Sequence, residues 1–257
     1  QQPAFGHSLD GLLRSRAEDL HGILNGIDYD QWNPGDAAAL PAPFSADDLG
    51  GKRRCKAALQ ERLGLEVDPD IPLAVAVSRL VHQKGLDVLA EVLPEAVGRP
   101  MQFALLGTGD PGLERLYRAV AQANPGRVAA TIEYNEDLAR LHYAGADMFV
   151  MPSRYEPCGL GQLIAMAYGA VPVVHATGGL ADTVSEAPPE QTGFICHYLA
   201  PKDLLSAIMR AADAYHHTPN RWRALTRSVM RRDFSWAESA RKYVQLYERA
   251  QRISEGG

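Results

Sequence analysis

The stretch "DMFVMPSRYEPCGLGQLIAMAYGAVPVV", residues 147–174, decides the fold. It indicates an apolar strand at 147–152, a turn rich in proline and glycine, an apolar helix at 160–168 and a second apolar strand at 170–174. A strand, a helix and a strand in succession are typical of a βαβ unit, whose two strands are parallel. The charged residues of the turn would then lie at the carboxyl-end edge of a parallel sheet.

The same alternation continues on both sides of this unit. Helical periodicity appears between further strands, for example at 85–97, where apolar residues recur at steps of three and four. Repeated alternation of this kind predicts an α/β fold, with a Rossmann-like parallel sheet that carries helices on both faces. The other predicted strands lie at 72–78, 101–106, 127–132 and 193–196, and the other intervening helices at 111–123 and 136–144.

The two ends of the chain depart from this pattern. Residues 30–51 are rich in proline and glycine and indicate an irregular excursion. After the last strand the sequence predicts three helices with no strand between them, at 202–217, 219–231 and 235–252. This C-terminal helical tail would either cover the sheet or cross to another domain.

Composition excludes several classes of function. The 257 residues are 46% hydrophobic and 22% charged, with a formal net charge of -5, so no basic block favours a nucleic-acid partner. No run approaches the roughly 20 apolar residues of a membrane span, and the first residues lack the pattern of a signal peptide. The three cysteines have neither disulfide-framework nor zinc-site spacing. We expect a cytoplasmic protein that binds no membrane, no nucleic acid and no metal.

In an open parallel sheet, ligands bind beyond the carboxyl ends of the strands, so the turns at that edge are the candidate sites. The first turn, "RLVHQKGLD" at 79–87, places Arg79 and Lys84 just before a helix that starts near Gly85. Two cations at a helix N-terminus suit a pair of phosphates. The alternative is that both are solvated loop charges.

The second turn, "GTGDPG" at 107–112, fits the dinucleotide-binding pattern. Gly107, Gly109 and Gly112 follow a strand and precede a helix, and Glu133 lies about 20 residues further on. This supports an alternative function, an oxidoreductase domain that binds NAD(P). The glycines would otherwise simply form a tight turn.

Three more turns carry candidate residues. Tyr134 follows the third strand, where its ring could lie against a nucleobase. Glu156 could accept hydrogen bonds from sugar hydroxyls, or it could cap a helix or pair with Arg154, while Cys158 could be a small buried residue. The backbone of Gly159, Leu160 and Gly161 could face a phosphate, and a last turn repeats this theme with Thr177, Gly178 and Gly179.

Four motifs, in this order and at this spacing, carry a family resemblance. They are "NGIDYDQWNP", "SRLVHQKGLD", "PSRYEPCGLGQL" and "TGGLADTV". Together they resemble the C-terminal half of the bacterial glycogen synthases and plant starch synthases. The resemblance implies one half of a GT-B enzyme, which has two facing Rossmann-like domains. Such enzymes transfer glucose, with retention, from ADP-glucose to the 4-hydroxyl at the non-reducing end of an α-1,4-glucan.

The resemblance also implies a role for each matching residue. Arg79 and Lys84 would hold the diphosphate and stabilise charge on the departing ADP, and Glu156 would contact the donor sugar. It implies no metal and no cofactor, with ADP-glucose as substrate and ADP as product. The expected nucleotide- or sugar-binding residues are Gly107, Gly109, Tyr134, Cys158, Gly159, Leu160, Gly161, Thr177, Gly178 and Gly179.

On this basis the chain divides into three predicted parts. Residues 1–22 would be the end of an interdomain connection, 23–232 the nucleotide-sugar-binding domain, and 233–257 a helix that crosses back toward an N-terminal Rossmann-like domain. The expected partners are ADP-glucose, an α-1,4-glucan acceptor and that N-terminal domain. The location would be cytoplasmic, or plastidic in a plant. The alternatives to a synthase half are the NAD(P)-binding domain and a stand-alone nucleotide-sugar binding module.

Overall fold

The computed structural model describes residues 8–36 and 38–255. Most of them form one unit, Ile27–Asp233, built on a six-stranded sheet with the strand order β3-β2-β1-β4-β5-β6. All neighbouring strands pair in parallel, as predicted. The strands are β1 Leu73–Val77, β2 Gln102–Leu106, β3 Val128–Thr131, β4 Met148–Met151, β5 Val171–His175 and β6 Phe194–Cys196.

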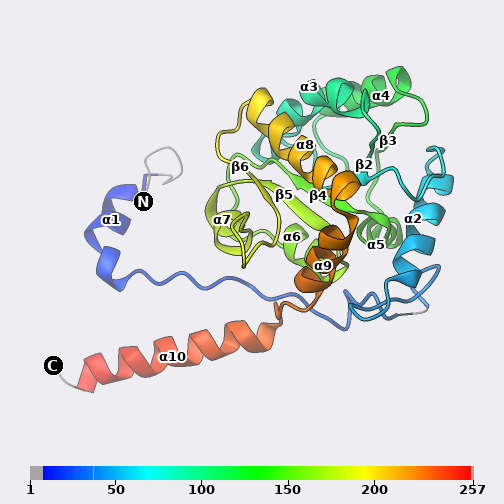
Figure 1. Cartoon of the computed structure of the whole chain (residues 1–257). Coiled ribbons are helices and arrows are strands. Elements are labelled where there is room, and N and C mark those ends of the chain that lie inside the picture. Colours follow the sequence, from blue (N-terminus) through cyan, green and yellow to red (C-terminus); the bar gives the residue numbers. More distant parts are fainter. Residues whose placement is uncertain (1–7, 37, 256–257) are drawn as a thin grey trace. The chain divides into compact units, whose positions relative to one another are not determined.

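Helices cover both faces of this sheet (Figure 1). One face packs against α3 (Leu86–Val97), α4 (Pro111–Ala123) and α8 (Pro201–His217), around buried side chains such as Phe103 and Met148. The other face packs against α2, α5 and α6, where the ring of Tyr143 lies 5.2 Å from that of Phe149. The bounds of these three helices are α2 Gly50–Arg62, α5 Glu136–Gly145 and α6 Gly161–Ala167. The remaining helices of this unit are α7 Gly178–Thr183 and α9 Pro219–Met230.

The order of the strands creates a switch point between β1 and β4. From β1 the chain moves outward through β2 to β3, and then returns to β4 on the other side of β1 before continuing to β5 and β6. The connections on the two sides of this point leave in opposite directions, and in open parallel sheets a ligand crevice is expected outside the strand ends at such a point. The loops that follow β1 and β4 are therefore called the crevice loops. The sheet thereby confirms the predicted fold and marks the edge where a ligand would bind.

The predicted elements agree with the structure to within about two residues at most ends. Capping explains the sharp starts: Asp110 accepts hydrogen bonds from the N–H groups of Gly112 and Leu113 at the head of α4, and Asn135 caps α5 in the same way. Three short helices are not predicted, because none has an apolar period long enough to detect: α1 (Asp10–Ser15) and the 3-10 helices Ala17–Asp19 and His82–Lys84.

A second unit is formed by the residues up to Gly26 together with those from Phe234 onward. Its main element is α10 (Trp236–Glu255), and the hydroxyl of Ser239 donates a hydrogen bond to the carbonyl of Leu24. Several large apolar side chains of α10 are exposed: Trp236, Tyr243, Val244, Tyr247 and Ile253. No helix within residues 8–36 and 38–255 is long and apolar enough to cross a membrane.

Candidate functional site

The loops after β1 and β4 meet at the switch point because Gly85 lets them approach. Gly85 has φ of 64°, a left-handed conformation that glycine adopts without steric cost. A methyl group in place of its hydrogen would lie 1.9 Å from the carbonyl oxygen of Pro152, at the end of β4. Only glycine fits both conditions, so this residue brings the short 3-10 helix His82–Lys84 against the β4 loop.

Arg154 joins the two loops. Its guanidinium forms a bidentate pair with Asp87, at 2.7 and 2.6 Å, and also donates to the carbonyl of His82 at 2.7 Å. The hydrogen bonds from Arg154 lower the pKa of the Asp87 carboxyl below its usual value. Further bonds link the Arg154 N–H to Gln83 and the Gln83 amide to Tyr155. The alternative in which Glu156 pairs with Arg154 is therefore wrong.

Glu156 pairs instead with Lys84. The two charged atoms, Nζ and Oε2, lie 2.6 Å apart, and the hydroxyl of Ser153 donates to the same carboxylate oxygen at 3.2 Å. Glu156 is buried, with 7% of its surface exposed, and Lys84 is half-buried. Burial and these contacts hold the carboxylate in a defined position at the edge of the crevice.

Arg79 differs from Lys84 although both were predicted to act together. Arg79 is exposed, and its guanidinium has no hydrogen bond or ion pair within the described part of the chain. Its backbone is held, since the neighbouring Leu80 makes a parallel bridge to Gly109. The first loop therefore presents one free cation, Arg79, and one cation that a carboxylate already neutralises.

Open backbone N–H groups follow Glu156 along the chain. Gly159, Leu160 and Gly161 precede or begin α6, and in the described residues none of their N–H groups donates a hydrogen bond. Gly159 has φ of 73°, and the amide of Gln162 packs against it while donating to the carbonyl of Cys158. Three unpaired N–H groups at one turn can bind an anion.

The turn after β5 packs against the backbone of the Glu156 loop. Methyl groups on Gly178 and Gly179 would lie 2.0 and 2.1 Å from the carbonyl oxygens of Glu156 and Cys158. The N–H of Gly179 donates to the Glu156 carbonyl at 3.0 Å, so it is already occupied. The Thr177 hydroxyl lies 3.5 Å from the Arg154 carbonyl. These glycines fix the position of the Glu156 loop, a role that the sequence alone did not suggest.

The "GTGDPG" turn has a related structural role. Methyl groups on Gly107 and Gly109 would lie 1.9 Å from the Ser78 carbonyl and 2.4 Å from the Leu80 carbonyl. The glycines let β2 and its turn run against the loop that carries Arg79, through bonds such as Leu80 N–H to Thr108 O at 2.9 Å. At both glycines a neighbouring backbone carbonyl occupies the place of a side chain, as the tight-turn interpretation predicts.

The structure does not support the dinucleotide interpretation of this turn. Its N–H groups are occupied by carboxylates: Asp110 accepts from Gly112, and Glu114 accepts from Gly109 at 3.1 Å. Two carboxylates would repel a pyrophosphate, and Gly109 further lowers the pKa of Glu114 by donating its hydrogen bond. Glu133, the expected ribose ligand, is exposed and accepts from Asn135.

Tyr134 lies in the exposed loop after β3. Its side chain is 80% exposed, and its hydroxyl donates to Glu136 at 2.6 Å. The strand order places β3 two strands from β1, at the sheet edge. The ring is free to receive a flat ligand that extends from the switch point toward β3, and its adenine-binding role stays a prediction.

Sequence reasoning missed the residues that hold the site together. Asp87 and Gln83 bond across the two crevice loops, and Ser153 bonds to Glu156 within the loop after β4. Each is a common polar residue near a strand or helix end. The only signal was their position within the turns at the carboxyl-end edge. Among the described residues, no group of three or more histidines, cysteines and carboxylates is arranged to hold a metal ion.

The strand order and its switch point define a Rossmann-like domain. A family model described as "Glycosyl transferases group 1" matches residues 71–214, which include both crevice loops. The chain belongs to this family of glycosyltransferases.

Two curated relatives of similar sequence are glycogen synthases. The chain is 49% identical to the glycogen synthase of Anaeromyxobacter sp. (strain Fw109-5) over 247 residues, and 47% identical to that of Syntrophotalea carbinolica over 253 residues. These matches cover 95% and 97% of this chain but 52% of each relative, so the chain spans about half the length of the curated relatives it matches.

Solved structures agree. The catalytic domain of starch synthase IV from Arabidopsis thaliana, solved with ADP and acarbose, superposes with a TM-score of 0.90 at 36% identity, over 96% of this chain and 52% of that one. The sucrose-phosphate synthase of Thermosynechococcus elongatus superposes with a TM-score of 0.65 at 25% identity, over 95% of this chain and 56% of that one. The resemblance drawn from the four motifs is thereby confirmed.

Proposed function

We propose that this chain is the donor-nucleotide half of an ADP-glucose-dependent α-1,4-glucan synthase, which transfers glucose with retention to the 4-hydroxyl of a glycogen or starch chain. The observation that carries the proposal is the arrangement at the switch point. Arg79, the Lys84–Glu156 pair and the open N–H groups of Gly159–Gly161 lie on the two loops that flank this crevice. They are the groups that a sugar diphosphate requires.

Each part of the donor has a matching group. The diphosphate would meet Arg79 and Lys84 on one side and the backbone N–H groups on the other, since both bind phosphate oxygens. When the bond to glucose breaks, negative charge grows on the departing ADP, and fixed cations stabilise that charge without reorganising. Arg79 and Lys84 therefore assist departure of the leaving group.

Glu156 has two effects in this proposal. Its carboxylate accepts hydrogen bonds from the hydroxyls of the donor glucose, and it holds the Lys84 ammonium in place before the donor binds. The arginine clamp between Arg154 and Asp87 keeps the two loops at a fixed separation, so that both sets of groups reach one ligand. The match to a starch synthase structure solved with ADP supports this assignment.

Calorimetric titration with ADP, ADP-glucose and UDP tests the proposal. Arg79→Ala should weaken ADP binding by about tenfold or more, because a charge-assisted phosphate contact is lost. Glu156→Gln should reduce the advantage of ADP-glucose over ADP, because the amide accepts weaker hydrogen bonds from the glucose hydroxyls than the carboxylate does. The matched control is Arg99→Ala, since Arg99 is exposed just before β2, at the opposite edge of the sheet.

Two results would overturn the proposal. One is the absence of ADP binding by the folded wild-type chain. The other is equal ADP affinity in wild type and Arg79→Ala, which would place the phosphates elsewhere. Preference for UDP over ADP would keep the site but change the donor.

A further inference from the structure

A second concave site lies at the opposite edge of the sheet from the crevice. It is a hollow of about 920 Å³ between α2 and α9, here called the α2–α9 hollow. One wall includes Asp147, which directly precedes β4 and accepts a hydrogen bond from the N–H of Leu73, the first residue of β1. The α2–α9 hollow therefore lies at the amino ends of the central strands, away from the proposed donor site.

The α2–α9 hollow is positively charged although the chain as a whole carries a net charge of -5. Lys56 is neutralised, because its Nζ lies 2.8 Å from the carboxylate of Asp147. Apart from this pair, four cationic side chains and two carboxylates line the hollow, which leaves a net charge of about +2. The lining cations are Lys52, Arg53, Lys56, Arg223 and Arg227, and the lining carboxylates are Asp48, Asp70 and Asp147.

The unpaired cations are held in different ways. Lys52 is buried, and its ammonium donates only to the carbonyls of Tyr168 and Ala144, at 2.8 and 3.1 Å. Arg227 likewise donates to the carbonyls of Ala46 and Asp47. Neither cation forms an ion pair with a carboxylate among the described residues. A buried cation without a counter-ion costs free energy that a bound anion would offset.

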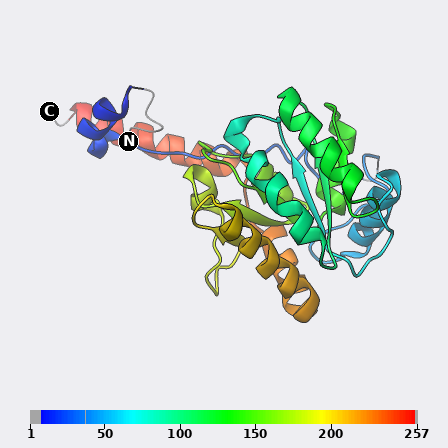
Figure 2. The ribbon, with the colours of Figure 1, turned by 90° about the horizontal axis from the view of Figure 1, so that it is seen from above.

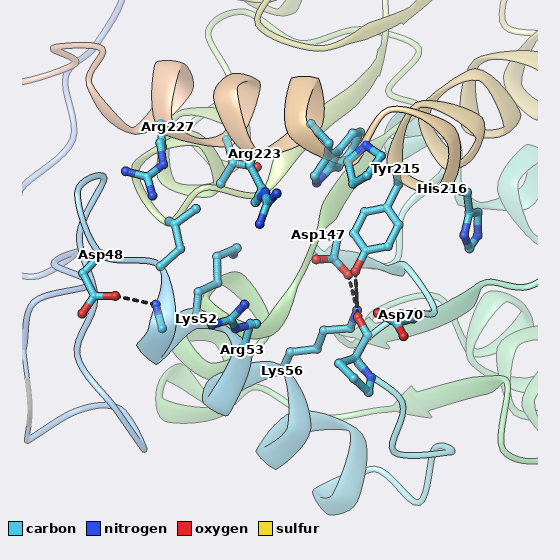
Figure 3. Close-up of a pocket in the computed structure, with 16 residues that line it drawn as sticks. Asp48, Lys52, Arg53, Lys56, Asp70, Asp147, Tyr215, His216, Arg223 and Arg227 are labelled. Atoms are coloured by element: carbon cyan, nitrogen blue, oxygen red, sulfur yellow. Dashed lines mark hydrogen bonds and ion pairs between the residues drawn. The ribbon is translucent and has the colours of Figure 1, made fainter.

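Two guanidiniums face one another across the α2–α9 hollow. Figure 3 shows Arg53 on α2 and Arg223 on α9 pointing toward the same space, with Asp48 and Asp70 on opposite sides of it. Within the described chain the Arg53 side chain has no hydrogen-bond or ion-pair partner, and Arg223 donates only to Asn220. Two facing like charges repel, and an anion between them attracts both guanidiniums and outweighs that repulsion.

We propose that the α2–α9 hollow is a second binding site, for a small molecule that carries a phosphate group. Phosphate fits better than carboxylate, because its oxygens are arranged tetrahedrally and two guanidiniums can bind them from opposite sides. The volume exceeds that of a phosphate ion, which leaves room for an attached group such as a sugar. The site is independent of the proposed donor site and does not rest on its function.

Calorimetric titration of the whole chain with inorganic phosphate, glucose 6-phosphate and uncharged glucose tests this site. We expect both phosphates to bind, and the double variant Arg53→Gln/Arg223→Gln to bind them at least about tenfold more weakly. The control is Arg62→Gln/Arg99→Gln, which removes two exposed arginines outside the α2–α9 hollow, one of them at the far end of α2. Tighter binding of glucose 6-phosphate would identify a phosphate ester as the ligand, and equal binding would identify free phosphate.

Three further measurements keep this test separate from the donor site. Phosphate binding should persist in Arg79→Ala, and ADP binding should persist in Arg53→Gln/Arg223→Gln. Raising the salt concentration should weaken phosphate binding. No binding of either phosphate at millimolar concentration, or binding that Arg79→Ala abolishes and Arg53→Gln/Arg223→Gln leaves unchanged, would overturn the proposal. Thermal melting verifies that each variant is folded.

Discussion

Single glycines decide how closely the loops of the crevice approach. Gly85 has a left-handed backbone, and the carbonyl oxygen of Pro152 lies where its Cβ atom would be. Gly64, just after α2, has a similar φ of 68° but open space around it. The pair separates two effects that usually occur together: the backbone preference and the close contact. At Gly85 both act on the loop that positions Lys84.

Gly85→Ala should therefore destabilise the chain more than Gly64→Ala. The left-handed conformation alone costs a non-glycine residue about 1 kcal/mol, and this is the loss expected for Gly64→Ala. The contact with the Pro152 carbonyl should add at least about 2 kcal/mol for Gly85→Ala, together with weaker ADP binding. Urea denaturation measures both losses. Equal losses in the two variants would show that the close contact does not matter.

The sequence predicted which residues line the crevice better than it predicted their partners. Glu156, Lys84 and Arg79 were recognisable from their positions after strands. A pair between Arg154 and Glu156 was one of the alternatives, but Arg154 binds Asp87, which is 67 residues away in the chain. Pair contacts of this kind depend on side-chain packing across two loops, and neither period nor spacing records that packing.

At the scale of elements, α5 carries a titratable group into the core. His142 is fully buried, with its Nδ1 2.7 Å from the Leu138 carbonyl and its Nε2 without a partner in the described chain. The last turn of α5 packs on α2, where Gly145 lies against Leu59. Burial lowers the pKa of His142 to about 4, because a charged imidazole would lose its hydration there.

Stability should consequently fall as the pH drops from about 6.5 to about 4. In that window the unfolded chain binds a proton at His142 that the folded chain excludes, so protonation favours unfolding. The contribution at the acid end is on the order of 3 kcal/mol. His142→Gln should lose less stability over this window than wild type does, as measured by urea midpoints at several pH values. Parallel pH curves for the two proteins would contradict the prediction.

Most strands and helices were predictable. Strands of a sheet that is covered by helices on both faces are continuous apolar runs, and the helices have apolar residues at steps of three and four. The sequence did not predict α1 or the 3-10 helix His82–Lys84, which are too short for a period to develop. Figure 2 shows the sheet between its layers of helices, which is the arrangement expected from the alternation of strands and helices.

At the scale of the whole molecule, the chain spans about half of its glycogen synthase relatives. In the proposed function, the described residues supply one side of the donor site: cations and N–H groups for a diphosphate, and a carboxylate for a sugar. Transfer to a glucan also requires a surface that orients the acceptor hydroxyl against the donor. The division of the chain at residues 22 and 232 stays a prediction, alongside the observed unit Ile27–Asp233.

We therefore expect the 257-residue chain by itself to bind ADP but to transfer no glucose. The measurement is incorporation of label from ADP-glucose into glycogen, with the same chain titrated against ADP in parallel. A full-length glycogen synthase relative serves as the positive control. Extension of glycogen by this chain alone, at a rate that Arg79→Ala reduces, would show that the acceptor surface lies within these residues.

The sequence by itself determined the class of fold, the edge of the sheet where the site lies, and the residue types that the site contains, because local periodicity and turn composition follow directly from the order of residues. Only the tertiary structure decided which charges meet. It paired Lys84 with Glu156 and Arg154 with Asp87, and among the residues it describes it left Arg79 unpaired. It also gathered Arg53 and Arg223 at one hollow, although 170 positions separate them in the chain. Such contacts arise from packing between distant segments, and a linear pattern carries no record of that packing.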